Sequence, residues 1–194
     1  DLPLSNAEAL EVSLLKGIRR MEWLAARWLL HQLTGAPHRM PLAKDAFSKP
    51  FFLDQPDLHC SLSHSHGVVG ALLAHQNCGC DIQILVEKMP RLAPKFMNAA
   101  ESDFAISHSE QDQFDLFHIF WTAKESLYKT YGLKELDFRM HMSIAPFEWN
   151  GIKGQAIGKI QKERIEQKFQ LIFEKSDLPS GAGAYICTTC HLLL

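Results

Sequence analysis

The sequence has no long apolar run, and this absence argues against a helix that crosses a membrane. Its longest uninterrupted apolar stretch, residues 67–74, has eight residues, whereas a transmembrane helix needs about 20. No charged-then-apolar leader opens the chain, so no secretory signal is predicted. With 46% hydrophobic and 22% charged residues, we expect neither a disordered chain nor a coiled coil. The composition predicts a globular protein with no membrane partner.

The sequence contains few cysteines, an odd number of them, and nearly equal numbers of basic and acidic residues. Five cysteines without a leader predict free thiols in a reducing, cytoplasmic compartment. A net charge of −2 argues against nucleic acid as a partner. The charge is uneven, however, because residues 16–49 hold seven basic and two acidic residues, a local excess of +5. A positive region of this size suits a small polyanion.

Helix and strand patterns alternate in blocks, which predicts an α+β fold. Ser5 and Glu8 form a capping box, and apolar residues at helical spacing between 10 and 29 predict helices that Gly17 divides and Gly35 ends. The other expected elements are a proline-containing loop over 35–57, strands within 58–86, helices over 100–109 and 115–131, and strands at 154–160, 168–174 and 183–188. We therefore expect two similar halves, 1–86 and 101–194, joined by segment 87–100.

Two segments carry acidic and amide oxygens in patterns suited to a hard cation. Asp81 and Gln83 are separated by two positions in a predicted strand, so their side chains share one face. Glu125 lies on a predicted helix one turn from Lys129. Mg²⁺ takes carboxylates together with substrate phosphates and water. Either segment alone is also consistent with a solvated surface, and Glu125–Lys129 with an ordinary surface ion pair.

Two further segments are polar or basic. Residues 63–67 place Ser63 and His64 on a tight connection, where their side chains can donate to phosphate oxygens. The loop from Lys44 to Lys49 and Pro50 is basic. Rival patterns are a haem-attachment motif at 187–191 and a zinc site from His75, Cys78 and Cys80, although neither has the expected context or spacing.

Taken in order, these segments resemble the 4′-phosphopantetheinyl transferase family, in its larger, monomeric, surfactin-synthetase-activating form. That family has a Gly-Lys-Pro loop, a Ser-x-Ser-His-Ser turn, a Gly-x-Asp-x-Glu strand and a Trp-x-x-Lys-Glu-(Ala/Ser)-x-x-Lys helix. The matching segments here are 48–50, 61–65, 79–83 and 121–129, and residues 19–27 resemble the family's first helix. Their order and spacing make coincidence improbable.

The resemblance implies transfer of the phosphopantetheine arm of coenzyme A, the co-substrate, to a serine of an apo acyl or peptidyl carrier protein. Adenosine 3′,5′-bisphosphate would be the other product, and Mg²⁺, or Mn²⁺, would be required. It also implies two pseudo-symmetric α+β halves with the active site in the cleft between them, and a monomer. Because Gln83 replaces the family's second acid, a non-catalytic homologue that binds coenzyme A or a carrier is the alternative. Ser48 also replaces the usual glycine.

The resemblance also assigns residues. Asp81, Gln83 and Glu125 would hold the metal, and Glu125, Lys129 and His64 would be catalytic, with Glu125 accepting the serine proton. The residues implied to bind coenzyme A are Arg19, Arg20, Lys44, Lys49, Pro50, Ser63, His64, Asp81, Lys124 and Lys129. Arg19 and Arg20 are alternatives for the 3′-phosphate. Segment 88–97, with three cations among Met, Leu and Phe, is either a surface for an acidic carrier or a plain linker.

Overall fold

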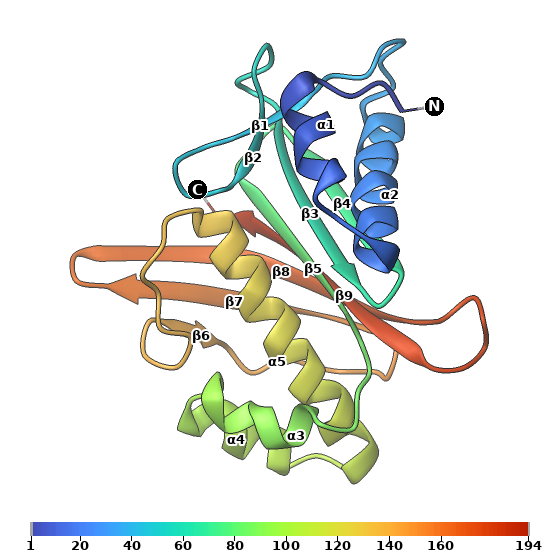
Figure 1. The fold of residues 1–194 in the computed structure, drawn as a ribbon. Coiled ribbons are helices and arrows are strands. Elements are labelled where there is room, and N and C mark those ends of the chain that lie inside the picture. Colours follow the sequence, from blue (N-terminus) through green and yellow to red (C-terminus); the bar gives the residue numbers. More distant parts are fainter. Residues whose placement is uncertain (1, 194) are drawn as a thin grey trace.

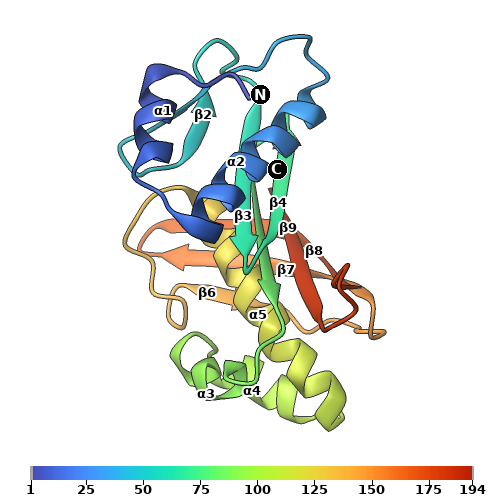
Figure 2. The ribbon, with the colours of Figure 1, turned by 45° about the vertical axis from the view of Figure 1, so that its right-hand side comes forward.

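The computed structural model describes residues 2–193, which form two antiparallel sheets with helices packed on them. The first sheet has four strands in the order β1-β2-β3-β4 and is covered by two helices (Figures 1 and 2). Its elements are α1 (Asn6–Ser13), α2 (Gly17–Thr34), β1 (Leu42–Lys44), β2 (Pro50–Phe52), β3 (His59–Ser65) and β4 (Val68–Ala74).

The second sheet has five strands in the order β5-β9-β8-β7-β6. The long helix α5 lies across it, and the short helices pack near the N-terminal end of α5 (Figure 1). The elements are β5 (Cys78–Ile84), α3 (Met89–Leu92), the 3₁₀ turn η1 (Ala93–Lys95), α4 (Ala99–Ile106), α5 (Glu110–Tyr131), β6 (Met142–Ile144), β7 (Lys153–Lys162), β8 (Ile165–Asp177) and β9 (Ala184–Leu192).

The α+β prediction is confirmed, and so are the predicted boundaries of the first helices and the predicted end of the long helix α5. Ser5 and Glu8 form the capping box, a helix break falls before Gly17, and Gly35 and Gly132 end their helices with φ of 61° and 73°. Left-handed φ favours glycine because it has no Cβ. The prediction of loop over 35–57 is incomplete, since β1 and β2 lie there, and α3, η1 and β6 were not predicted.

The apolar spacing that predicted the first helices marks their exposed face. Leu14 and Trp28 are 76% and 54% exposed, and Leu10, Ile18 and Met21 are exposed with them. The buried face of α2 carries Glu22, Trp23, Ala26, Arg27 and Leu30 instead. The periodicity identified helices correctly, but polar residues with internal partners occupy part of the side that faces the sheet.

The two sheets do not divide at the predicted boundary between halves. β5 belongs to the segment 1–86, yet it pairs with β9 along seven residues and forms one edge of the second sheet. β5 therefore links the two halves, and the helix α5 packs directly on it. No helix among residues 2–193 is long and apolar enough to cross a membrane.

Candidate functional site

Gly79 allows helix α5 to lie in direct contact with strand β5. A Cβ atom at this position would overlap the Ser126 carbonyl oxygen and the Thr130 hydroxyl of the helix. The glycine is therefore required for close packing, not for an unusual backbone angle. This contact places the Asp81 end of β5 beside the Glu125–Lys129 turn of α5.

We expect Gly79→Ala to push α5 away from β5. Overpacking of this kind typically costs about 1–3 kcal/mol, and it should also lower the activity of the site that the contact builds. Gly70→Ala in β4 is the matched control, because a Cβ there would lie 3.9 Å from Ile82, an ordinary contact. Chemical denaturation of both variants measures the difference; equal stability would contradict the packing argument.

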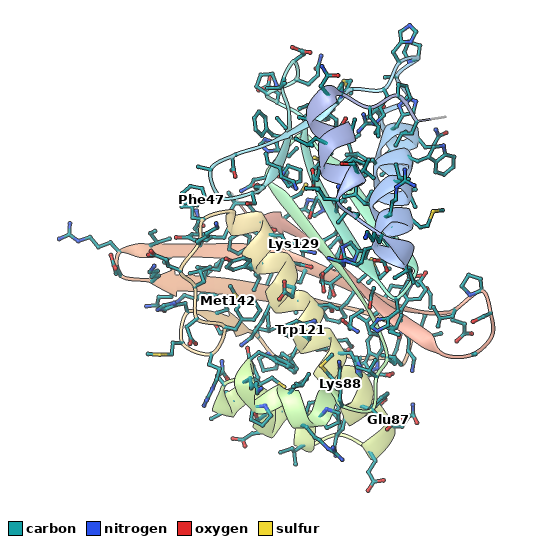
Figure 3. All side chains as sticks on the ribbon, in the orientation of Figure 1. Phe47, Glu87, Lys88, Trp121, Lys129 and Met142 are labelled. Carbon is teal, nitrogen blue, oxygen red and sulfur yellow. The ribbon has the colours of Figure 1, made fainter. Side chains whose placement is uncertain are left out.

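Asp81 is 7% exposed and is held by two side chains from other elements. The Lys129 ammonium donates to Asp81 Oδ1 at 2.7 Å, and the Ser63 hydroxyl donates to the same oxygen at 2.7 Å. Lys129 Nζ also donates to the carbonyls of Cys80, at 3.0 Å, and Leu62, at 3.3 Å. Strands β3 and β5 and helix α5 thus meet at one carboxylate (Figure 3 labels Lys129).

Glu125 lies one helical turn before Lys129, and its carboxylate takes part in none of the hydrogen bonds or ion pairs found among residues 2–193. Burial, and to a smaller extent the negative charge of Asp81, raise the pKa of Glu125 to about 7, against the opposing effect of Lys129. The two carboxylates are thus close enough to interact electrostatically, and their joint role as metal ligands stays a prediction. Gln83 is half-buried and its amide donates to the Ile84 carbonyl at 2.9 Å.

The Ser-x-Ser-His-Ser segment forms a seam between the two sheets. Its three serine hydroxyls accept hydrogen bonds at 2.9–3.2 Å from three N–H groups on β5, the edge strand of the second sheet. The pairs are Ser61 with Cys80, Ser63 with Ile82 and Ser65 with Ile84. All three serines are buried. The Ser63 hydroxyl accepts from Ile82 and donates its hydrogen to Asp81. In this structure it therefore has no hydrogen left for the contact with a diphosphate that the sequence predicted.

The Lys49 loop lies against the C-terminal end of α5. Lys49 Nζ donates to the Thr130 carbonyl at 3.0 Å and to Asn77, and a Cβ at Gly132 would lie 2.9 Å from Lys49 Cδ. Ser48 has a φ of 73°, a conformation that favours glycine. The serine therefore occupies a backbone conformation that glycine would adopt with less strain. Burial lowers the pKa of Lys49.

A pocket of 210 Å³ lies between this loop, strand β3 and the end of α5. Lys49, Pro50 and Lys129 line it together with the aromatic rings of Phe47 and Tyr128. A second pocket, of 390 Å³, contains Glu125 with Trp121, Leu92 and Lys95. Two predicted site residues of α5 thus line separate pockets beside the helix: Lys129 lines the first pocket and Glu125 lines the second.

Arg19 and Arg20 differ clearly in their surroundings. The Arg19 guanidinium lies 2.9 Å from the ring nitrogens of His64 and 3.7 Å from Glu22, whereas no hydrogen bond or ion pair of Arg20 is found among residues 2–193. Burial and the positive charge of Arg19 lower the pKa of His64. Lys44 is apart from this cluster, since its ammonium pairs with Glu11 of α1. Of the two arginines, Arg19 is the one placed beside His64.

Lys124 does not lie with the other predicted phosphate ligands. Its side chain is 0% exposed, and its ammonium donates to Glu101 at 2.6 Å and to three carbonyl oxygens. The acceptors are Phe96 and Phe138 at 2.8 Å and Met142 at 3.2 Å. Lys124 faces the core while Glu125 faces the pocket, because successive helix residues point about 100° apart. Lys124 thus connects α5 to neighbouring segments inside the core. The prediction that it binds phosphate is wrong for this structure.

Segment 88–97 was predicted to be either a surface for a carrier or a plain linker. In the structure it contains the helix α3 and the 3₁₀ turn η1. Its apolar residues Met89, Phe96 and Met97 belong to the core, so they are not anchors for a partner. Lys88, Arg91 and Lys95 are exposed. These cations remain available to another molecule, together with the half-buried Leu92 in the pocket that contains Glu125.

The rival cofactor patterns find no support in the geometry. Cys187 and Cys190 lie on β9 three residues apart, so they point to opposite faces and cannot both hold one haem. Among residues 2–193, no group of three or more His, Cys, Asp and Glu side chains could hold a metal ion. Any cation at Asp81 and Glu125 therefore depends on two acids only.

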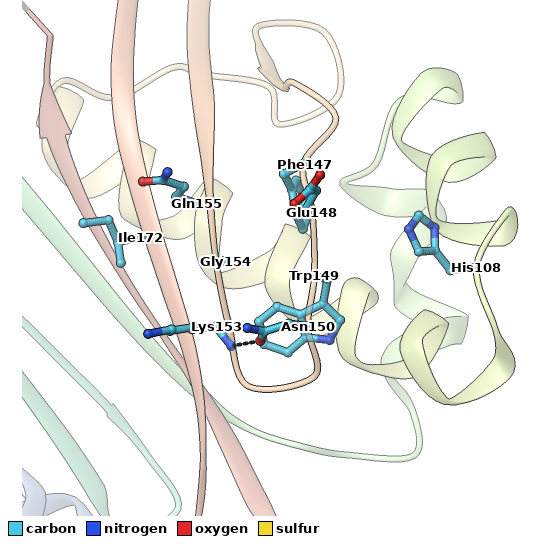
Figure 4. A pocket seen from close by; sticks show the side chains of 9 residues that line it. All are labelled: His108, Phe147, Glu148, Trp149, Asn150, Lys153, Gly154, Gln155 and Ile172. Carbon is cyan, nitrogen blue, oxygen red and sulfur yellow. Dashed lines mark hydrogen bonds between the residues drawn. The ribbon is translucent and has the colours of Figure 1, made fainter.

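A larger pocket, of 910 Å³, lies elsewhere in the second half (Figure 4). It is lined by Phe147 and Trp149 from the segment before β7, by Lys153 at the start of β7, and by His108. None of the predicted site residues lines it. The chemistry suggested by the sequence therefore belongs to the smaller openings beside α5.

The sequence is similar to those of known proteins. A sequence model of the 4′-phosphopantetheinyl transferase superfamily matches residues 77–190. The chain is 31% identical over 144 residues to the 4′-phosphopantetheinyl transferase AcpT of Escherichia coli O157:H7, covering 67% of this chain and 70% of the relative. It is 28% identical over 171 residues to the 4′-phosphopantetheinyl transferase gsp of Aneurinibacillus migulanus, covering 88% of this chain and 66% of the relative.

Proposed function

Because the chain belongs to the 4′-phosphopantetheinyl transferase superfamily and is an enzyme of that activity, we propose that coenzyme A is its donor and an apo acyl or peptidyl carrier protein its acceptor. The reaction converts the carrier from its apo to its holo form and releases adenosine 3′,5′-bisphosphate. The single observation that carries this proposal is the β5–α5 contact, across which Lys129 is paired with Asp81 one helical turn from Glu125.

The donor set at this contact suits a divalent cation. Asp81 and Glu125 supply two carboxylates. Burial and the negative charge of Asp81 raise the pKa of Glu125, and a bound cation would favour its ionised form. Mg²⁺ is commonly held by one or two carboxylates together with water and substrate phosphates. The Gln83 carbonyl oxygen is a further candidate ligand, without the charge of an acid. When bound, Mg²⁺ or Mn²⁺ would neutralise charge on the diphosphate as the leaving group departs.

The protein's own groups can then perform the transfer. The carrier serine oxygen attacks the β-phosphorus of coenzyme A, and the bond from this phosphorus to the oxygen of adenosine 3′,5′-bisphosphate breaks. Glu125 accepts the serine proton, directly or through water. Lys129 supplies positive charge beside the diphosphate, and Asp81 holds the Lys129 ammonium in place.

We place the nucleotide end of coenzyme A in the opening that lies about one helical turn further along α5. The 210 Å³ pocket offers Lys49, Lys129 and two aromatic rings, which suit a base and phosphate groups. Arg19 and His64 offer a guanidinium and an imidazole for a phosphate, since a planar guanidinium can bind two oxygens. We assign these residues, with Pro50, to coenzyme A. We further propose a cytoplasmic monomer; the five free cysteines are consistent with a reducing compartment.

The direct test incubates the protein with coenzyme A, Mg²⁺ and several apo carrier proteins from fatty-acid, polyketide and peptide pathways. Intact-mass spectrometry should show the addition of one phosphopantetheine group to at least one carrier, and chelation of the metal should prevent it. If no carrier gains mass at any divalent-ion concentration while coenzyme A still binds, the non-catalytic alternative replaces this proposal.

The exposed cations of segment 88–97 predict the sign of the carrier surface. Lys95 lines the pocket that contains Glu125, and Lys88 and Arg91 extend the same positive segment. Reversal of two exposed charges, Lys88→Glu with Arg91→Glu, should raise the KM for an acidic carrier about tenfold, because charges at the rim of an interface mainly change association. The KM for coenzyme A should not change.

The matched control reverses Arg164 and Lys168, two exposed cations at the far end of β7 and β8. Steady-state kinetics at two salt concentrations compare the variants, since added salt should reduce the difference between Lys88→Glu/Arg91→Glu and the unaltered protein. Equal effects of the two double reversals would rule out a specific role for segment 88–97.

A further inference from the structure

Glu22 is a buried acid that the proposed reaction does not use. It is 4% exposed on the inner face of α2, among residues that pack on the first sheet. A buried carboxylate is costly unless it is paired or hydrogen-bonded. Glu22 has three partners, and two of them are the groups proposed above to bind phosphate.

The contacts of Glu22 connect helix α2 to the end of strand β3. Its Oε1 accepts a hydrogen bond from the Gly67 N–H at 2.7 Å. Its Oε2 lies 3.3 Å from His64 Nδ1 and 3.7 Å from Arg19 Nη1. Arg19 Nη1 in turn lies 2.9 Å from the His64 ring. One carboxylate therefore touches the backbone of a turn, an imidazole and a guanidinium.

The turn itself needs an external support. His66 and Gly67 have φ of 47° and 88°, which is the two-residue turn that joins β3 and β4. The Gly67 N–H points to Glu22, so the turn is attached to α2. His64, three residues earlier on β3, is held close to Arg19 on α2 by the same attachment.

Charge explains why an acid is needed here. Arg19 and His64 lie so close together that the positive charge of Arg19 lowers the pKa of His64, while Glu22 has the opposite effect. Without Glu22, Arg19 would be free to move away, because its side chain is largely exposed. With Glu22, both donors stay together.

We propose that Glu22 is a positioning residue that holds Arg19 and His64 together to receive a phosphate group of coenzyme A. The proposal rests on the proposed function for the identity of the ligand. A purely structural role would consist of the Gly67 hydrogen bond alone. Replacement by glutamine separates the two roles, since its amide oxygen still accepts from Gly67 while the negative charge is lost.

The experiment compares Glu22→Gln, Arg19→Ala, the double variant and the control Arg164→Ala, which removes an exposed arginine elsewhere in the chain. We expect Glu22→Gln to raise the KM for coenzyme A about tenfold, with kcat changed less than twofold and the melting temperature nearly unchanged. Arg164→Ala should resemble the unaltered protein. In the double variant, the loss should be smaller than the sum of the two single losses, because residues that act through one another are not additive.

Calorimetry with coenzyme A in the absence of a carrier provides a second readout. Glu22→Gln should weaken this binding by the same factor as it raises KM. Unchanged binding, or additive effects in the double variant, would overturn the role of Glu22 while leaving the proposed function intact. If the unaltered protein binds coenzyme A but modifies no carrier, the proposed function fails and calorimetry still decides on Glu22. Absence of coenzyme A binding by the unaltered protein would overturn both.

Discussion

Glu125→Gln should reduce phosphopantetheine transfer by about 10²–10⁴-fold while making the metal-free protein more stable at pH 8. The loss of activity follows from the roles assigned to the carboxylate, because removal of a general base typically costs this factor. The change is nearly isosteric, so the pocket lined by Trp121, Leu92 and Lys95 should keep its shape.

The gain in stability follows from the pKa of Glu125. Burial raises the pKa to about 7 in the folded protein, above the ordinary value of 4.5. A raised pKa of an acid means that its contribution to stability is complete below pH 4.5 and is lost as the pH rises through 7. Each unit is worth about 1.4 kcal/mol, so up to about 3 kcal/mol is lost at pH 8. Glutamine does not ionise and avoids this loss.

Thermal unfolding in the presence of a chelator measures the effect. The melting temperature of Glu125→Gln should exceed that of the unaltered protein by about 5–10 °C at pH 8, and the difference should narrow below pH 5. Glu174→Gln, at an exposed position on β8, is the control and should show no such pH dependence. If Glu125→Gln were destabilising at pH 8, the carboxylate would not be buried beside Asp81 as described.

Lys124→Met should destabilise the protein by about 3–5 kcal/mol. The substitution removes the ammonium but leaves the Glu101 carboxylate buried without its partner, which is the costly way to break an internal ion pair. It also removes the donor that connects α5 to the carbonyls of Phe96, Phe138 and Met142. A domain has only about 5–15 kcal/mol of stability, so this is a large fraction.

The double variant Lys124→Met/Glu101→Gln tests the reason for that loss. The Glu101 carboxylate also accepts from the N–H groups of Asn98 and Ile144, and glutamine can keep one of these contacts. The double variant should therefore recover part of the stability in urea unfolding. A Lys124→Met variant within about 1 kcal/mol of the unaltered protein, but with a raised KM for coenzyme A, would restore the original assignment of Lys124 to phosphate.

These two neighbouring residues show what the sequence could and could not predict. The shared role of Asp81 and Glu125 as metal ligands stays a prediction, although the structure packs β5, which carries Asp81, directly on α5, which carries Glu125. The motif singled out both Glu125 and Lys124 through the family resemblance. It did not separate Glu125 from Lys124, since the position of the core around α5 depends on Glu101 and the 138–142 segment, which are distant in sequence. Tertiary packing decided which of two adjacent charges faces solvent.

The first half of the chain shows the same limit. Ser63, on the connection 63–67, was interpreted as a phosphate donor, but its hydroxyl binds Ile82 N–H and Asp81 of β5, partners that no local pattern reveals. Glu22 appeared only as one of two acids in a basic region. Its environment depends on the turn at Gly67, so only the fold could identify it as buried.

The central claim is that Asp81 and Glu125, from separate elements, together hold the divalent ion of the transfer site. Electron paramagnetic resonance of Mn²⁺ with coenzyme A measures this most directly, because bound Mn²⁺ loses the signal of the free ion. The unaltered protein should bind Mn²⁺, and Asp81→Asn and Glu125→Gln should each weaken that binding strongly. Binding of Mn²⁺ by either variant with the affinity of the unaltered protein would contradict the account.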